Sequence, residues 1–153
     1  MFGDFEIHEP ATVPEAVDML TQFGDGATVY AGGTELLLIM KEGLVYYPHL
    51  VNIKTIPNLN SIVMENDKKR LRIGALVTHR QLEQTTLVRE RVPLLSEAAA
   101  RVGNLRVRIA GTIGGNVCFA EPHSDPATLL LACGASMELS GKNGIRIVPA
   151  DDF

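Results

Sequence analysis

Two pairs of adjacent glycines stand out, because a glycine pair lets the backbone approach another group closely. Gly32-Gly33 is followed by Thr34, and Gly114-Gly115 is followed by Asn116. A backbone without Cβ atoms can adopt positive φ, and successive N–H groups of such a turn can point into one concavity that binds an anion. Two such turns offer a way to hold the two phosphoryl groups of a diphosphate without any lysine.

Neither glycine pair belongs to a standard nucleotide motif. The chain has no GxxxxGK sequence followed by Ser or Thr, and the run Gly111-Thr-Ile-Gly-Gly115 does not fit GxGxxG. A double-glycine turn is often only a tight structural turn, and this alternative stays open for each pair. We expect Thr34 to cap a helix over residues 35–42, where Glu35 in the first turn has helix-dipole complementation as its alternative role.

The remaining reactive side chains give weaker signals. Asp125 stands before Pro126, so a plain helix N-cap is the alternative to any binding role. The four histidines are scattered and no pair has ligand spacing, so no metal ligand is predicted: His8, His49, His79 and His123. The two cysteines lie 15 residues apart without a CxxC pair, which favours a reducing cytoplasm and no zinc or iron–sulfur site. No catalytic triad is present, so no catalytic side chain is predicted.

Composition excludes several classes of protein. The 153 residues are 46% hydrophobic and 21% charged, which is ordinary for one soluble globular domain or two small subdomains. A net charge of -4 without a basic stripe argues against nucleic acid as the main partner. The longest aliphatic run, Leu36-Leu-Leu-Ile-Met40, is far shorter than the roughly 20 residues that span a bilayer. The acidic N-terminus does not resemble a secretory signal. We therefore expect a cytoplasmic protein with no membrane span.

Local patterns predict a small α/β unit over residues 1–55 and a second α+β unit over residues 56–153. The first unit is expected to contain a strand over 5–8, a helix from the capping box Thr12 to Glu15 up to Gly24, a strand over 27–31, a glycine turn with its helix, and a strand over 49–53. The second is expected to contain a hairpin (61–65 and 70–74) with its tip at 66–69, helices over 78–90 and 93–102, a glycine-rich loop, a helix through 129–132, and a hairpin (135–140 and 145–148).

Three motifs in order carry a family resemblance: Ala31-Gly-Gly-Thr-Glu-Leu-Leu37, Gly111-Thr-Ile-Gly-Gly-Asn116, and Ala120-Glu-Pro-His-Ser-Asp125 with Leu129-Leu-Leu-Ala132. The chain resembles the flavin-binding subunit of molybdenum hydroxylases over essentially its whole length. This family includes the medium subunit of carbon monoxide dehydrogenase, the flavin domain of xanthine dehydrogenase and the flavin subunit of 4-hydroxybenzoyl-CoA reductase. The cysteine-rich insert of the last branch is absent from this segment.

The resemblance implies a two-subdomain, mixed α+β FAD-binding fold of the vanillyl-alcohol oxidase and molybdopterin dehydrogenase type, with its C-terminal part missing. Two sets of residues would hold the FAD pyrophosphate from its two sides: Ala31, Gly32, Gly33, Thr34, Glu35 and Leu36 in one, and Thr112, Gly114, Gly115 and Asn116 in the other. Asp125 would lie on the ribose or adenosine side. The flavin itself carries the redox chemistry in such proteins.

The partners implied are a molybdopterin-binding large subunit, a small subunit with 2Fe–2S clusters, and an external electron acceptor such as NAD or a quinone. Two alternatives from other classes stay open at this stage. One is a self-contained FAD reductase of the enolpyruvyl-sugar type, which needs a substrate domain and a proton donor. The other is a non-catalytic domain that serves as a subunit-interaction module.

Overall fold

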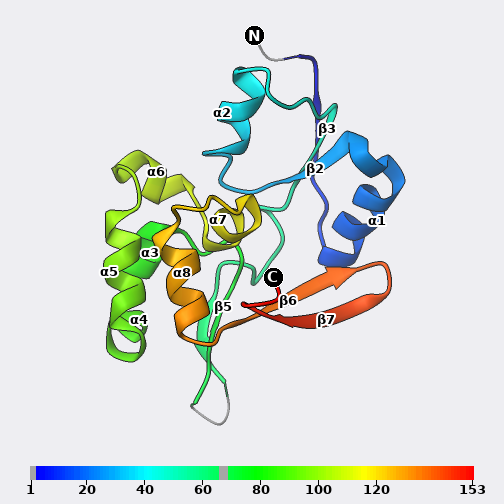
Figure 1. The fold of residues 1–153 in the computed structure, drawn as a ribbon. Helices are drawn as coiled ribbons and strands as arrows, with labels where there is room; N and C mark the ends of the chain where they lie inside the picture. Colours follow the sequence, from blue (N-terminus) through cyan, green and yellow to red (C-terminus); the bar gives the residue numbers. More distant parts are fainter. Residues whose placement is uncertain (1–2, 66–68) are drawn as a thin grey trace. The chain divides into compact units, whose positions relative to one another are not determined.

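The computed structural model describes residues 3–65 and 69–153, so most of the expected hairpin tip at residues 66–69 lies outside the described residues. The chain divides into two compact units, one formed by residues 1–57 with 136–153 and the other by residues 58–135 (Figure 1). The expected cofactor subdomains, residues 1–55 and 56–153, stay a prediction. No helix in the described part of the chain is long and apolar enough to cross a bilayer.

A parallel three-stranded sheet forms the centre of the first unit. Its strands are β1 (Glu6–His8), β2 (Ala27–Tyr30) and β3 (His49–Asn52), and β3 lies in the middle. Leu50 and Val51 of β3 are fully buried, in keeping with the central place of this strand in the sheet. The expected strands are therefore confirmed with ends that differ by one residue.

Helix α1 (Val13–Phe23) packs against this sheet and begins at the predicted cap. The Glu15 N–H donates to Thr12 Oγ1 at 3.3 Å, whereas the Glu15 carboxylate accepts from the N–H of Ala11 at 2.8 Å rather than from the cap residue. Gly24 ends the helix with a φ of 55° and a ψ of -135°, a conformation that residues with a Cβ rarely adopt.

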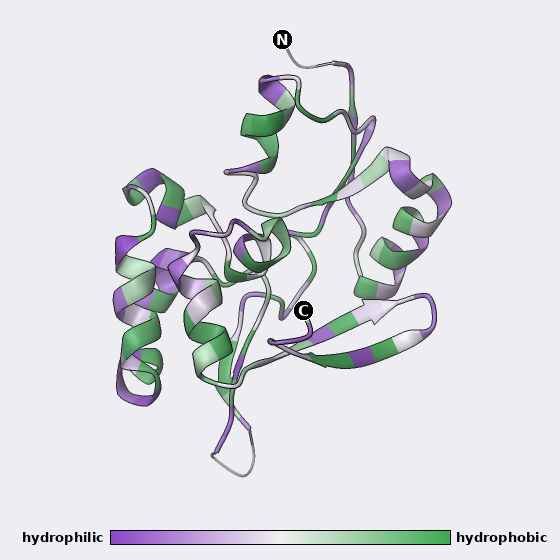
Figure 2. Cartoon of the chain, in the orientation of Figure 1, coloured by the Kyte–Doolittle hydropathy of each residue, from purple (hydrophilic) through white to green (hydrophobic). Residues whose placement is uncertain are grey.

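The hairpin of β6 (Ser136–Gly141) and β7 (Gly144–Pro149) completes the first unit, and β6 contacts α1. Hydrophilic and hydrophobic residues alternate along its strands (Figure 2). Met137, Leu139 and Val148 are half-buried, whereas Ile145 and Ile147 are exposed. The register, Met137 opposite Val148 and Ser140 opposite Ile145, is the one that the predicted hairpin needs.

The second unit is mainly helical around one apolar core. Its elements are the hairpin β4 (Ile62–Met64) and β5 (Leu71–Ile73), and the helices α3 (His79–Gln84), α4 (Thr86–Arg91), α5 (Pro93–Arg101), α6 (Leu105–Ala110), α7 (Ile113–Phe119) and α8 (Asp125–Ala132). Val77, Leu82, Val88, Leu95 and Ala99 are buried together in this core, and Ile113 joins them from the start of α7.

Two expectations for this unit are wrong. The helix expected over residues 78–90 breaks at Thr85, whose ψ of 121° is extended, so that α3 and α4 are separate helices. The stretch expected to be a glycine-rich loop contains α6 and α7 instead. Asn104 caps α6 by accepting from the N–H groups of Arg106 and Val107, and this short cap signal was overlooked in the sequence.

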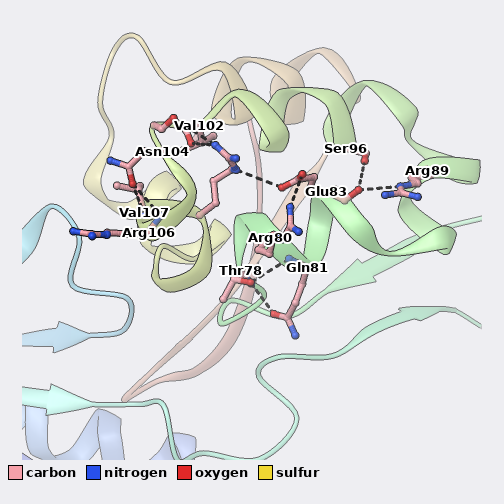
Figure 3. A network of polar contacts seen from close by, with 12 residues as sticks. Thr78, Arg80, Gln81, Glu83, Arg89, Ser96, Val102, Asn104, Arg106 and Val107 are labelled. Carbon is pink, nitrogen blue, oxygen red and sulfur yellow. Dashed lines mark hydrogen bonds and ion pairs between the residues drawn. The ribbon is translucent and has the colours of Figure 1, made fainter.

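A polar network around Glu83 ties α3 to α5 and α6 (Figure 3). Its carboxylate lies 2.7 Å from Nη1 of Arg80 and 3.3 Å from Nε of Arg108, and its backbone carbonyl accepts from Ser96 Oγ and Arg89 Nε. Glu83 and Arg108 are both about four-fifths buried in their side chains, at 21% and 17% exposure. The network therefore fixes α6, the helix that leads directly into Gly111 and Thr112.

Candidate functional site

The first glycine pair forms an open turn between β2 and α2 (Leu36–Lys41). Gly33 has a φ of 70°, and its carbonyl accepts from the N–H of Leu37 at 3.1 Å. A Cβ at this position would lie 2.5 Å from the Tyr30 ring and 3.2 Å from the Leu37 side chain. Both the conformation and the close approach of Tyr30 thus require glycine, and the predicted turn is confirmed here.

The turn presents several hydrogen-bond donors. Within the described part of the chain, the N–H groups of Thr34, Glu35 and Leu36 have no protein acceptor. The Thr34 hydroxyl was expected to cap the helix, but Glu35 occupies the N-cap position, and its side chain accepts no hydrogen bond from the backbone N–H groups of the first turn. Among the residues that the structure describes, the Thr34 hydroxyl also has no hydrogen-bond partner. Consecutive donors without acceptors at the carboxyl end of a parallel strand are an arrangement suited to an anionic ligand.

The second glycine pair is helical, which corrects the expectation of a second turn with positive φ. Gly114 and Gly115 lie inside α7, and neither has a positive φ. Thr112 caps this helix, because its Oγ1 accepts from the Gly115 N–H at 3.1 Å, and its carbonyl accepts from the Asn116 N–H at 2.9 Å.

Gly114 is needed for close packing inside the second unit. The N–H groups of Ile113 and Gly114 donate to the carbonyls of Val77 and Ala75 at 2.9 and 3.0 Å. A Cβ on Gly114 would lie 2.7 Å from both the carbonyl oxygen and the Cβ of Ala75. The four N–H groups of residues 113–116 all have protein acceptors, so this backbone does not offer the anion-binding donors that the sequence suggested.

Gly115 and Asn116 present a different surface. Gly115 is exposed, and a Cβ there would approach only Thr112 Oγ1, at 2.9 Å. The Asn116 side-chain oxygen accepts from Ser124 Oγ at 2.6 Å. The side-chain NH₂ group of Asn116 takes no part in this bond and can donate to another group. The bond also ties α7 to Ser124, which lies in the third motif and caps α8.

Asp125 is not the N-cap of α8, so the alternative considered for it from the sequence is wrong. Ser124 caps the helix, accepting from the N–H of Ala127 at 3.4 Å, and Asp125 is the first helical residue, followed by Pro126. The Asp125 carboxylate is exposed. Nearby His123 is also exposed and bonds to Glu121 at 2.7 Å. The hydrogen bond from the His123 side chain lowers the pKa of Glu121.

Each unit, taken by itself, offers groups that suit part of a dinucleotide. Unpaired N–H groups and the Thr34 hydroxyl suit phosphoryl oxygens. The exposed carboxylate of Asp125 suits ribose hydroxyls, which donate to it. No lysine needs to contact the phosphate in such a site.

Comparison with known proteins identifies the family. The family described as FAD binding domain in molybdopterin dehydrogenase matches residues 3–153. The chain belongs to this family. Its mixed α+β fold and its cofactor, FAD, are those of the family.

Several relatives are similar over nearly the whole chain. The carbon monoxide dehydrogenase medium chain of Hydrogenophaga pseudoflava is 41% identical over 97% of this chain and 51% of that protein. The caffeine dehydrogenase subunit beta of Pseudomonas sp. (strain CBB1) is 33% identical over 97% of this chain and 50% of its own length. The xanthine dehydrogenase FAD-binding subunit of Escherichia coli O157:H7 is 31% identical over 100% of this chain and 52% of its own length. This FAD-binding domain thus spans about half the length of these relatives.

Solved structures show the same fold. A carbon monoxide dehydrogenase structure from Hydrogenophaga pseudoflava matches with a TM-score of 0.95 at 40% identity, covering 99% of this chain and 52% of that chain. The quinoline 2-oxidoreductase from Pseudomonas putida 86 matches with a TM-score of 0.95 at 31% identity, covering 100% of this chain and 53% of that chain. The expected fold class and family are therefore confirmed.

One group of side chains was missed in the sequence. Glu6, His8 and His49 lie together in the first unit, although 41 residues separate the two histidines. Glu6 and His8 share one face of a strand because side chains alternate along it. The position of His49 became visible only from the pairing of β1 with β3, which no local pattern reveals.

Proposed function

We propose that this domain is the FAD-binding part of the flavin subunit of a molybdopterin-dependent dehydrogenase. Electrons would arise at a molybdopterin centre on a large subunit, cross 2Fe–2S clusters on a small subunit, reach FAD on this chain and leave to an external acceptor. The proposal is supported by the relatives reported above, which are named as a medium chain of carbon monoxide dehydrogenase and a beta subunit of caffeine dehydrogenase. Bound FAD supplies the redox chemistry, while the residues of this chain bind and orient it. The reducing cytoplasm is its proposed location.

The turn at residues 31–36 carries the proposal. It combines a positive φ at Gly33, three N–H groups without protein acceptors, and the unpaired Thr34 hydroxyl. We assign these donors to the pyrophosphate of FAD, with Ala31 and Gly32 keeping the approach free of bulky side chains. Hydrogen bonds to a charged acceptor contribute about 1.5–3 kcal/mol each, so this turn is the largest single source of affinity proposed for the chain.

Residues of the second unit have more varied proposed roles. Gly115 offers an exposed surface without a side chain, and the Asn116 amide offers donors beside it. Thr112 and Gly114 hold α7 in place, and they act on FAD by positioning these neighbours. We assign the exposed carboxylate of Asp125 to the ribose hydroxyls. That both motifs contact one diphosphate stays a prediction from the sequence.

The test compares two glycines that have nearly the same φ. Gly33 and Gly43 have φ values of 70° and 73°, which residues with a Cβ rarely adopt, so an alanine at either position meets a similar restriction on φ. FAD affinity would be measured by titration, following the quenching of flavin fluorescence, in variants whose circular dichroism shows a folded chain. Gly33→Ala should weaken FAD binding about 10- to 100-fold, corresponding to one lost charge-assisted hydrogen bond.

The control variant Gly43→Ala should bind FAD as the unmodified chain does, because nothing lies within 4 Å of a Cβ at that position. Equal losses of affinity in the two variants would show that general destabilisation of the first unit, and not the turn itself, affects FAD. Unchanged affinity in Gly33→Ala would contradict the assignment of this turn to the pyrophosphate.

A further inference from the structure

Three side chains with metal-binding atoms converge at the start of two neighbouring parallel strands. Glu6 and His49 are the first residues of β1 and β3 and lie opposite each other in the sheet register. His8 is two residues after Glu6, so its side chain leaves β1 on the same face. The cluster therefore lies entirely within the first unit, on strands whose pairing fixes it.

The distances match a small coordination site. His8 Nε2 lies 3.1 Å from His49 Nδ1, and each nitrogen lies 3.9 Å from Glu6 Oε2. A circle through three points with these separations has a radius of about 2.1 Å, and zinc binds histidine nitrogen at about 2.0–2.1 Å and carboxylate oxygen at about 2.0–2.2 Å. One ion can thus reach all three atoms with little movement of the exposed Glu6 side chain.

The surroundings hold the two imidazoles while leaving the cluster accessible. The side chains of His8 and His49 are 21% and 28% exposed, whereas that of Glu6 is 74% exposed. The Phe23 ring stacks on His49 with centroids 4.1 Å apart and lies 4.7 Å from the His8 ring. Aromatic packing thus fixes the ring planes, and the ion would enter from the Glu6 side.

We propose that Glu6, His8 and His49 form a binding site for a divalent cation of the zinc type. Two imidazoles and one carboxylate are a donor set that suits Zn²⁺ and similar borderline ions. Without an ion, the two rings share a single N–H···N hydrogen bond, and the carboxylate at 3.9 Å is too distant to bond to either. An ion uses all three groups at once and links β1 to β3.

This site is distinct from the proposed FAD site. Glu6 and His49 lie at the amino ends of their strands, whereas the glycine turn follows the carboxyl end of β2 in the same parallel sheet. The proposed role of the ion is therefore structural, since it would bind the folded first unit and stabilise it. The site can exist whether or not the chain binds FAD.

The test is a calorimetric titration of the full chain with ZnCl₂, after treatment with a chelator and its removal. The expected result is one Zn²⁺ per chain, with Co²⁺ giving the visible absorption bands of a tetrahedral N/O site. His49→Gln should weaken zinc binding by at least about 100-fold, since even changes outside the ligands themselves cost 10- to 100-fold. Glu6→Gln should weaken it at least 10-fold, and this exposed side chain can be replaced without disturbing the core.

Two matched variants serve as controls. Glu42→Gln removes another exposed carboxylate of the first unit, and His123→Gln removes an exposed histidine of the second; both should leave zinc affinity unchanged. The proposal is overturned if the unmodified chain binds no zinc, if Glu6→Gln binds as tightly as the unmodified chain, or if His123→Gln weakens binding as much as Glu6→Gln does. Should His49→Gln fail to fold, Glu6→Gln and its control decide the outcome.

Discussion

Replacing Gly114 by alanine tests whether this glycine serves packing. An alanine in a helix interior normally stabilises a protein by about 0.5–1 kcal/mol relative to glycine. At position 114, however, the new Cβ would lie 2.7 Å from the backbone oxygen of Ala75, and backbone is costly to displace. Overpacking costs about 1–3 kcal/mol, and disturbing the hydrogen bond from the Gly114 N–H to Ala75 costs about 0.5–1.5 kcal/mol more. Subtracting the usual gain from alanine leaves a net loss of about 0.5–4 kcal/mol.

The assay is thermal unfolding followed by circular dichroism, where each kcal/mol shifts the midpoint by about 2–4 °C in a chain of this size. Gly115→Ala is the matched control, because it lies in the same helix and its Cβ would meet only Thr112 Oγ1, at 2.9 Å, and no backbone atom. The usual gain from alanine, about 0.5–1 kcal/mol, opposes the cost of this contact, so Gly115→Ala should lose less stability than Gly114→Ala. A Gly114→Ala variant that is as stable as the unmodified chain, yet binds FAD poorly, would refute the packing argument. It would indicate instead that Gly114 contacts FAD directly.

Two further predictions concern the second unit. Glu83→Gln leaves two arginines with a weaker partner, so unfolding free energy should fall by about 1–3 kcal/mol, whereas the exposed Glu90→Gln should change it by less than about 0.5 kcal/mol; equal effects in urea unfolding would contradict a stabilising network. Burial lowers the pKa of His79, so the unfolded chain takes up the proton first as the pH falls. The free energy of unfolding that depends on neutral His79 is therefore fully present above pH about 6.5. It falls as the pH drops below that value, by at most about 1.4 kcal/mol per pH unit. The unfolding free energy of His79→Gln should change less between about pH 7.5 and about pH 5.5 than that of the unmodified chain. Parallel pH profiles of the two proteins would exclude His79 as the cause of the pH dependence.

Local signals in the sequence were sufficient for most of the strands and helix starts. Thr12 and Thr78 cap their helices as expected, and Thr78 with Gln81 forms a complete capping box. The first glycine turn was also predictable, because Gly33 follows a β-prone run and precedes an apolar helix. These features depend on neighbours within a few residues, which is the range over which a single sequence is informative.

Tertiary contacts account for what the sequence did not reveal. The start of α7, which contains Gly114 and Gly115, is held by hydrogen bonds from Ile113 and Gly114 to Val77 and Ala75, 36 and 39 residues earlier in the chain. Glycine has a low helix propensity, so a local prediction favours a loop, and packing against the earlier segment overrides it. The proximity of His8 and His49 likewise follows only from the pairing of β1 with β3.

The central claim is that this chain binds FAD through its diphosphate and adenosine portion. Calorimetric titration with FAD, repeated in the presence of ADP or of riboflavin, tests this claim most directly. The account predicts one FAD per chain, displacement by ADP, and no competition from riboflavin. Competition by riboflavin but not by ADP, or a folded chain that binds neither FAD nor ADP, would contradict it.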